Sequence, residues 1–382
     1  MSESSPLGAA SPKGLRTHNL RVVLEEKRKA FWAQRFHRAR TGMDRPGETS
    51  ARPPEQPGSG PGGKQYAHLR VLSRSRGSGA TAYWIFEPVA PSPHTAPVIV
   101  FLHGWGGTNP VLHGAWIDHL VMRGNVVVFP VYQTSVQSET KQALKNTMLA
   151  IRDAYRYMNT YKYVRYDWDR YAIIGHSAGG VLAAQLAALA TQAQLPLPRA
   201  VMAIHPSRGQ DIRHPLPRIS LRSISSLTLL LIAVGQDDQT AGDREGRALF
   251  LQTPQIPAVN KNFVMVISDF HGTPPLVANH IAPVAPRRGA ALLLAQQETS
   301  SPQSITDLLR LKGNRVDALH YYGYWKLADA LCDAAFSGRN REYVLGNTSQ
   351  LRFMGMWSDG TPVNELEVGL PSVRRKIERT SS

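Results

Sequence analysis

Residues 173–180, IIGHSAGG, place Ser177 between glycines directly after an apolar run. A serine hydroxyl is a weak nucleophile unless a base accepts its proton, a third group orients that base, and donors stabilise the oxyanion. Flanking glycines let the backbone pass close to its neighbours, so the serine can occupy a sharp turn between a strand and a helix. The pattern therefore favours Ser177 as a nucleophile over a serine in an ordinary surface turn.

A glycine-rich loop, FLHGWGGTNP at 101–110, follows an earlier apolar run. In the strand–turn–helix arrangement, one oxyanion donor is the N–H after the nucleophile and the other comes from the loop after an early strand. The sequence therefore predicts an oxyanion hole made by the backbone of Trp105 and Ala178. The alternative is an ordinary loop in which the glycines serve only the turn.

Two adjacent aspartates, Asp237 and Asp238, follow the apolar run LLLIAVG. One of them can orient the base, and the other would then be a solvated turn residue or a helix cap. We expect Asp238 to be the orienting acid because it lies three residues after the turn glycine Gly235. Asp237 is the alternate.

The base is expected after the last apolar run, where SDFHGTPP contains His271. The chain order Ser177, Asp238, His271 is the serine–acid–histidine order of such a site. His280, in VANHIAP, is the main alternative; it lies further from the strand end, where a structural or lid role is expected. The remaining histidines lack zinc-site spacing, and the glycines near residue 60 do not follow a strand, so no metal and no cofactor is predicted.

Alternating apolar runs and longer helical patterns, from about residue 66 onward, must position these residues. Continuous β-branched and aliphatic runs are typical of strands buried on both faces of a parallel sheet. With helical patterns between them, they predict an α/β fold: a mostly parallel central sheet with helices on both faces. The expected strands are 81–89, 96–104, 125–133, 170–176, 199–207, 226–235 and 262–270, and the main helices are 138–161, 178–194 and 316–338.

The four motifs HGWGG, GHSAGG, VGQDD and SDFHG, in this order, resemble the α/β-hydrolase superfamily. The chain looks most like the branch that holds dienelactone hydrolases, chlorophyllase-like proteins and poly(ethylene terephthalate) hydrolases. The motifs span about residues 103–271, roughly the central half of the chain. The resemblance implies the α/β-hydrolase fold and hydrolysis of ester or related acyl bonds through an acyl-enzyme at Ser177.

Composition divides the chain into three parts. Residues 1–65 are predicted to be a basic, largely disordered extension that contains a helical pattern at 19–39 and ends in a Pro/Gly-rich linker. The catalytic domain is expected at 66–345, with a lid or insertion at 272–304 near the active-site mouth, because that segment leaves the carboxyl end of a strand. Residues 346–382 form a tail with no counterpart in the minimal fold.

The net charge of +16 on 382 residues is spread thinly, apart from 12 Lys/Arg against 6 Asp/Glu in residues 1–65. Because no basic run is interleaved with aromatic residues, we expect no nucleic-acid partner; weak contact of residues 1–65 with anionic membranes is the alternative use of this charge. The single cysteine, Cys332, excludes an internal disulfide framework. No run approaches the ~20 apolar residues of a membrane span and no secretory signal is seen, so a cytoplasmic protein is predicted.

The sequence thus predicts a serine esterase that acts on a small-molecule or lipid-like ester. A peptidase or acyltransferase built on the same three residues is the first alternative, because the residues do not specify the bond that is cleaved. A non-catalytic protein that uses the same pocket to bind a ligand is the second. Presence of all three residue types in the expected order argues against the second.

Overall fold

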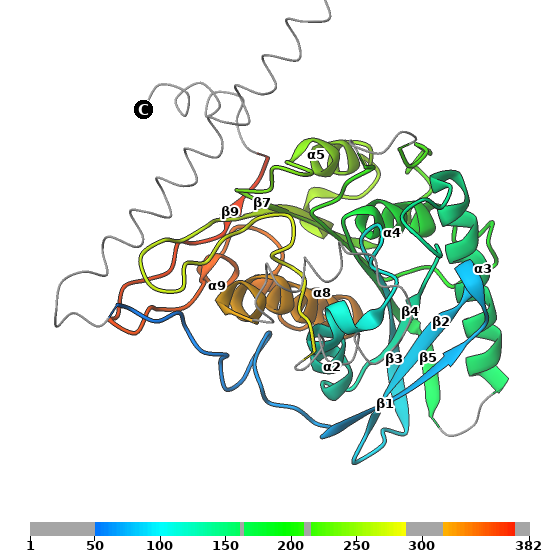
Figure 1. Ribbon diagram of the computed structural model, residues 1–382, viewed down its shortest axis with the longest axis horizontal. Helices are drawn as coiled ribbons and strands as arrows, with labels where there is room; N and C mark the ends of the chain where they lie inside the picture. The colour runs from blue at the N-terminus through cyan, green and yellow to red at the C-terminus, as the bar shows by residue number, and fades with distance from the viewer. Residues whose placement is uncertain (1–49, 161–163, 210–214, 288–315, 371–382) are drawn as a thin grey trace, which may run out of the picture.

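The computed structural model describes residues 50–160, 164–209, 215–287 and 316–370. In these residues a nine-stranded sheet has the order β1-β2-β4-β3-β5-β6-β7-β8-β9. The six strands from β3 to β8 run parallel to one another, whereas β1, β2 and β9 are antiparallel to their neighbours at the two edges (Figure 1). The strands are β1 Arg70–Arg76, β2 Tyr83–Val89, β3 Thr95–Leu102, β4 Val126–Pro130, β5 Arg165–His176, β6 Ala200–Ile204, β7 Leu229–Gly235, β8 Lys261–Val266 and β9 Glu367–Val368.

The central strands are buried because their residues are apolar on both faces. Every residue of β6, AVMAI, and of β7, LLLIAVG, is buried. Helices must therefore cover the sheet on both sides, since no strand face of this kind can be left to water. Edge strand β1, with the sequence RVLSRSR, is mostly exposed instead.

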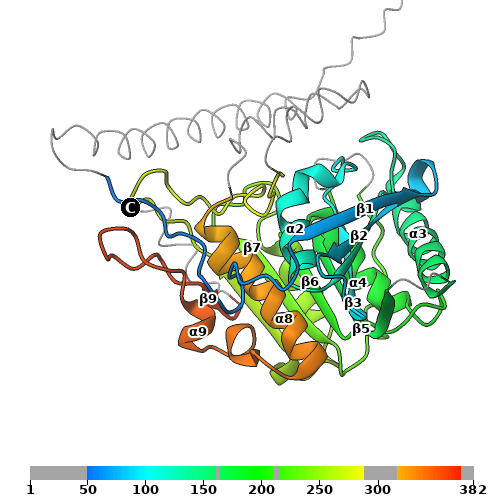
Figure 2. The same ribbon diagram turned by 90° about the horizontal axis from the view of Figure 1, so that it is seen from below.

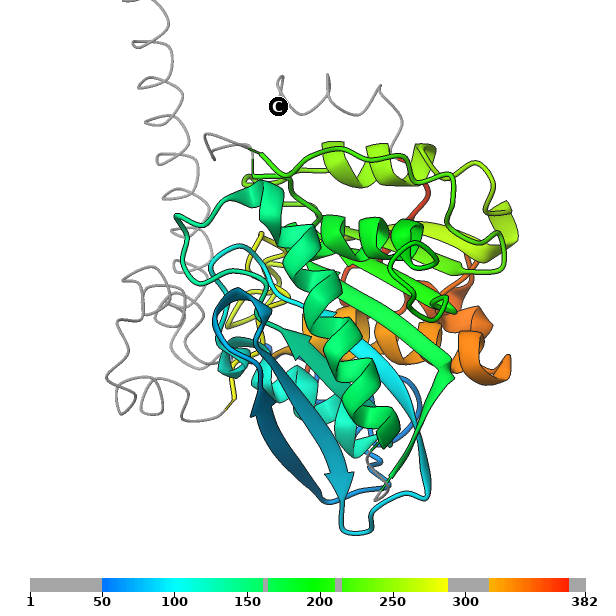
Figure 3. The same ribbon diagram turned by 90° about the vertical axis from the view of Figure 1, so that its right-hand side faces the viewer.

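Two layers of helices cover the two faces of the sheet. Helices α3, α4 and α5 pack on one face and share its apolar core, and α2 and α8 pack on the other. In Figure 3 the green helices α3 and α4 lie in front of the sheet and the orange helix α8 lies behind it. The helices are α2 Gly114–Met122, α3 Thr140–Thr160, α4 Ala178–Leu189, α5 Arg244–Leu251, α8 Trp325–Ser337 and the short α9 Ser349–Arg352.

The predicted α/β architecture is confirmed, and all seven expected strands are present with ends shifted by a few residues. The two edge strands β1 and β9 were not expected. Strand β1 lacks a strong apolar signal because it lies at an edge, and β9 is only two residues long. The helical pattern at 19–39 lies outside the described residues. None of the helices in the described ranges is long and apolar enough to cross a membrane.

Residues 50–66, expected to include a flexible linker, run along the domain instead. The backbone N–H of Thr273 donates to the carbonyl of Ala51 at 2.8 Å, and the N–H of Gly62 donates to the buried carboxylate of Asp329 at 2.7 Å. Figure 2 shows this blue segment passing beside α8 before it enters β1. For this stretch the linker prediction is wrong, because backbone groups of the segment find partners on the domain that composition does not reveal.

The C-terminal segment to residue 370 completes the domain. Strand β9 extends the sheet beyond β8, with Val368 opposite Val264. The side chain of Trp357 is buried, and its indole N–H donates to Asp269 at 3.2 Å. This part of the expected tail therefore belongs to the same packed body. The segment expected as a lid or insertion at 272–304 is described only as far as residue 287.

Candidate active site

Ser177 occupies the turn between β5 and α4, as the sequence predicts. Its φ of 56° lies in the left-handed region that non-glycine residues rarely adopt. The glycines around it have no room for a side chain: a Cβ on Gly175 would lie 2.0 Å from the carbonyl oxygen of Gly179, and one on Gly179 would lie 2.2 Å from that of Leu102. The strained turn therefore depends on glycine at positions 175 and 179, two residues before and two residues after Ser177.

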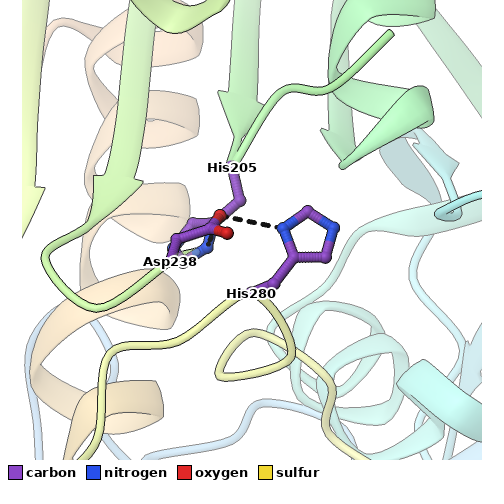
Figure 4. A group of neighbouring side chains, drawn as sticks. All are labelled: His205, Asp238 and His280. Carbon is purple, nitrogen blue, oxygen red and sulfur yellow. Dashed lines mark hydrogen bonds and ion pairs between the residues drawn. The ribbon is translucent and has the colours of Figure 1, made fainter. Parts of the chain in front are cut away.

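The imidazole beside Ser177 belongs to His280. Its Nε2 lies 2.9 Å from the Ser177 Oγ, and its Nδ1 lies 2.8 Å from the Asp238 Oδ2. Ser177 follows β5 and Asp238 follows β7, so both stand at the carboxyl ends of parallel strands, where ligands bind in such sheets. His280 comes from the loop after β8, as Figure 4 shows for the histidine and the aspartate. The three residues form a serine–histidine–carboxylate chain.

The expectation that His271 lies beside Ser177 is wrong. The His271 side chain is exposed, and its Nε2 lies 2.7 Å from the Asp359 carboxylate. After β8 the chain forms a short loop, which two backbone hydrogen bonds of 2.8 Å between Asp269 and Leu276 close. His271 lies on this loop, and the chain returns towards Ser177 and Asp238 only afterwards. The GTPP sequence directly after His271 was the available signal, because a proline pair marks a turn.

Of the two adjacent aspartates, Asp238 faces the histidine, as expected. Its Oδ1 accepts hydrogen bonds from the backbone N–H groups of Thr240 at 3.0 Å and Ala241 at 2.8 Å. Burial by itself raises the pKa of the Asp238 carboxyl, but contacts with His205 and His280 outweigh burial and hold this pKa well below its usual range. The carboxylate is therefore ionised at neutral pH. Asp237 makes no contact of this kind with the histidine.

The hydrogen bonds fix which nitrogen of His280 carries its proton. An ionised carboxylate can only accept, so the nitrogen facing Asp238, Nδ1, must be the donor. The other nitrogen, Nε2, is then free to accept the proton of Ser177. His205, Asp238 and His280 also offer ligand atoms within 4.8 Å of one another (Figure 4). A metal would need the lone pair of the nitrogen that is donating to Asp238, so the arrangement fits proton transfer better than metal binding.

A cavity of about 260 Å³ opens in front of Ser177. Trp105 and Ala178, the predicted oxyanion donors, both line it, and Gly104 approaches so closely that a Cβ there would lie 3.2 Å from the Ser177 Cβ. The N–H of Ala178 is at the first turn of α4, where N–H groups have no partner within the helix. The Trp105 indole N–H donates to the Val136 carbonyl at 2.9 Å, which fixes the ring.

The cavity wall is mainly apolar, with one cation. Its apolar side chains are Trp105, Leu112, Leu216, Ile281 and Val284. Arg208 stands at the same wall, where its Nε donates to the carbonyl of Leu216 at 2.6 Å. The site can therefore accommodate a small apolar group beside the serine.

His176, next to the serine, was not expected to serve the site. Its Nε2 lies 2.9 Å from the backbone carbonyl of His280. Burial lowers its pKa well below the usual value, and the neighbouring His280 lowers it further. His176 is therefore neutral and can donate to that carbonyl, which fixes the loop that carries His280. No sequence signal marks this role, because the contact joins residues 104 positions apart.

The comparison with protein families agrees with this architecture. Residues 99–239 match the model of a family described as alpha/beta hydrolase fold. The chain has the α/β-hydrolase fold, as the resemblance of its motifs implied. A solved structure of an esterase from the fungus Rhizomucor miehei is 17% identical, covers 65% of this chain and 86% of its own chain, and gives a TM-score of 0.43. Likeness at this score supports no inference about function. None of the curated proteins compared with the chain matches it.

Proposed function

We propose that this chain is a serine hydrolase that cleaves carboxylic esters through an acyl-enzyme at Ser177. The observation that carries the proposal is the unbroken chain of contacts from Ser177 through His280 to Asp238, with separations of 2.9 Å and 2.8 Å. These are the distances at which a base can remove the proton of a nucleophile and an acid can orient the base. The order of the motifs also resembles that of the branch that holds dienelactone hydrolases, chlorophyllase-like proteins and poly(ethylene terephthalate) hydrolases.

The reaction follows from the positions of the protons. His280 Nε2 accepts the proton of Ser177 as Oγ attacks the ester carbonyl, and Asp238 stabilises the imidazolium that forms. Backbone N–H groups of Trp105 and Ala178 are the proposed donors to the oxyanion. The imidazolium then gives its proton to the leaving alcohol, and a water activated by the same nitrogen releases the acid.

The cavity favours a small or compact acyl group. Its volume of about 260 Å³ lies just below the range of about 300–1,000 Å³ for small-molecule sites, and its apolar walls offer few polar partners. A carboxylic ester fits such a wall better than a peptide, whose backbone groups need hydrogen-bond partners on both sides of the cleaved bond. A peptidase or an acyltransferase on the same three residues is the alternative within this chemistry.

Labelling with a fluorophosphonate probe tests the proposal directly. The probe forms a covalent bond only with an activated serine, so we expect the wild-type protein to be labelled at Ser177 and to hydrolyse short p-nitrophenyl esters. A panel of aryl amides, tested beside the esters, separates an esterase from a peptidase. A folded protein that neither reacts with the probe nor turns over any ester would instead be a non-catalytic binding protein, and the proposal would fail.

A further inference from the structure

A second imidazole contacts the aspartate of the proposed triad. His205 follows the last residue of β6, and its Nδ1 lies 3.0 Å from the Asp238 Oδ2, the same oxygen that His280 contacts. Figure 4 shows His205 and His280 on either side of the carboxylate, one from the end of a strand and the other from the loop after β8. Both side chains in the pair His205–Asp238 are completely buried.

Tyr324 reaches the far side of the same histidine. Its hydroxyl lies 2.9 Å from the His205 Nε2, and the whole tyrosine is buried. Tyr324 is the last residue of the π-helical turn Leu319–Tyr324, which leads directly into α8. Turns of this kind are rare and frequently occur at functional sites. The structure therefore presents a row of five groups, from Ser177 through His280, Asp238 and His205 to Tyr324.

The protons of this row can be assigned from the chemistry of its members. The ionised Asp238 only accepts, so the His205 nitrogen that faces it, Nδ1, carries a proton. Burial holds the pKa of Tyr324 well above its usual value, so its hydroxyl is protonated and can donate to Nε2. His205 is then neutral, with its Nδ1 at 3.0 Å from the Asp238 Oδ2. A charged His205 would cancel the negative charge that His280 needs beside it.

The backbone around His205 departs from common geometry to hold this side chain. The φ of His205 is 45°, in the left-handed region that a histidine rarely adopts, and its N–H donates to the carbonyl of Ala233 at 2.7 Å. On the neighbouring strand, a Cβ on Gly235 would lie 2.5 Å from the His205 Cε1. The imidazole therefore occupies space that only a glycine at 235 leaves open.

We propose that His205, oriented by Tyr324, is a positioning residue of the hydrolase site that holds the Asp238 carboxylate in place for His280. The proposal rests on the proposed function, because it concerns the acid of that triad. With His205 and His280 on Oδ2 and two backbone N–H groups on Oδ1, the carboxylate has donors on both oxygens. Without His205, the carboxylate loses an imidazole that lies 3.0 Å from its Oδ2 and does not itself change protonation in the reaction.

The molecule contains a matched control for this arrangement. His119 is also buried, contacts the buried Asp329 at 2.9 Å through Nε2, and lies 3.1 Å from the Tyr66 hydroxyl through Nδ1. This second tyrosine–histidine–aspartate row joins α2 to α8 and includes no residue of the cavity in front of Ser177. A substitution of His205 and a substitution of His119 each remove a contact with a tyrosine and a contact with an aspartate. Only the substitution of His205 should change ester hydrolysis.

The test compares ester hydrolysis by full-length wild type and four variants: His205→Leu, His205→Asn, Tyr324→Phe and His119→Asn. We expect His205→Leu to lower kcat by about 100-fold with little change in KM, the size of effect that a small misplacement of a triad group produces. His205→Asn places an amide donor where Nδ1 stood and should recover most of this loss. Tyr324→Phe should lower kcat by a smaller factor, and His119→Asn should leave kcat unchanged.

The pH profile of kcat/KM gives a readout that a merely structural role would not move. The groups that face Asp238 and His205 are His280, His176 and Tyr324, and His320 lies against Tyr324 on the π-helical turn. Loss of the His205 donor leaves the carboxylate more basic and strengthens its pull on the His280 proton. Both effects move the acidic limb of the profile to higher pH in His205→Leu, and His205→Asn should move it back.

Four outcomes decide between the proposals. A folded His205→Leu with wild-type kcat and an unmoved acidic limb overturns the proposal while leaving the esterase intact. If His119→Asn loses as much kcat as His205→Leu, and the acidic limb of His205→Leu does not move, both rows are only structural. That result also overturns the proposal. If His205→Leu does not fold, the kcat and the acidic limb of Tyr324→Phe are compared with those of the wild type. A wild-type kcat with an unmoved limb in Tyr324→Phe then overturns the proposal. A wild-type protein that is not labelled at Ser177 defeats the proposed function itself, and is thereby distinguished from these outcomes.

Discussion

Two histidine–aspartate pairs in the described part of the chain, His280 with Asp238 and His119 with Asp329, differ in which group faces the second nitrogen of the histidine. In the pair of His280 and Asp238, that nitrogen faces the hydroxyl of Ser177 at the edge of a cavity. In the pair of His119 and Asp329, it faces the hydroxyl of Tyr66. The first arrangement leaves a nucleophile open to a ligand, and the second joins the N-terminal segment, α2 and α8 through a tyrosine, a buried histidine and a buried aspartate.

The two carboxylates also differ in their other partners. Asp329 accepts from the backbone N–H of Gly62 and lies 3.1 Å from the Arg123 Nε, so a cation balances its charge. No Lys or Arg in the described part of the chain forms an ion pair with Asp238, whose charged form is held by histidines and backbone N–H groups. A carboxylate that is not neutralised by a cation keeps its field available to stabilise an imidazolium. We therefore propose that the same pair of residue types serves chemistry in one place and stability in the other.

The largest effect should come from breaking the serine–histidine contact. Ser177→Ala and His280→Ala should each lower kcat by about a million-fold, because members of a triad act as a unit. His271→Ala should leave turnover unchanged, since that side chain is exposed and contacts Asp359. Steady-state kinetics on a p-nitrophenyl ester measures all three. A large loss in His271→Ala together with full activity in His280→Ala would contradict the geometry.

The next largest effect on kcat should come from substitution of Asp238, the acid of the proposed triad. Asp238→Asn should lower kcat by about ten-thousand-fold, because an amide facing the imidazole favours the wrong tautomer. Asp237→Asn is the matched control, since the neighbouring carboxylate does not contact His280, and should lose only a modest factor. The two variants need to be compared at the same pH. Equal small losses at both positions would mean that another group orients the histidine.

Breaking the second pair should cost stability instead of activity. Asp329→Asn leaves His119 and Arg123 without their charge partner, and we expect a loss of about 3–5 kcal/mol in the free energy of unfolding. Burial raises the pKa of Asp329, but His119 and Arg123 outweigh it and lower this pKa below the usual value. The contribution is therefore complete above the unfolded pKa of about 4 and is lost as the pH falls below it.

Urea unfolding at several pH values measures this prediction. The difference between wild type and Asp329→Asn should be constant near neutral pH and should shrink as the pH falls below about 4. Asp359→Asn is the control, because its carboxylate forms an exposed pair with His271 and should change stability little at any pH. A pH-independent difference for Asp329→Asn would show that the carboxylate contributes by its shape alone.

The smallest effect concerns where the chain begins. A protein that starts at Ser50 should keep the stability and turnover of the full chain, since residues 1–49 supply no member of the triad. A protein that starts at Tyr66 loses the hydrogen bond from Gly62 to Asp329, and should lose about 1–3 kcal/mol of stability while its kcat on a small soluble ester stays the same. Thermal unfolding and ester kinetics on both proteins check the two statements. A folded protein that starts at Tyr66 but is inactive would show that the N-terminal segment shapes the cavity.

Local pattern was sufficient for one part of the site. The position of Ser177 depends on glycines within two residues of it and on the strand and helix on either side, all of which are visible in the sequence. Asp238 was also found, because it directly follows a strand that is unmistakably apolar. The base was predicted at His271, nine residues before His280. The prediction was wrong because the bridge between Asp269 and Leu276 sets how many residues form a loop before the chain returns to the sheet.

By itself, the sequence determined the alternation of buried strands and helices, the sharp turn at Ser177 and the order of the reacting groups, since each depends on residues close together in the chain. Only the tertiary structure decided which histidine meets the serine, that His205 and Tyr324 stand behind Asp238, and that residues 50–66 pack against α8. These contacts join positions from about 33 to 267 residues apart, as for His205 with Asp238 and Gly62 with Asp329. Periodicity and spacing carry no information over such distances, whereas packing of the two helical layers on the sheet fixes all of them at once.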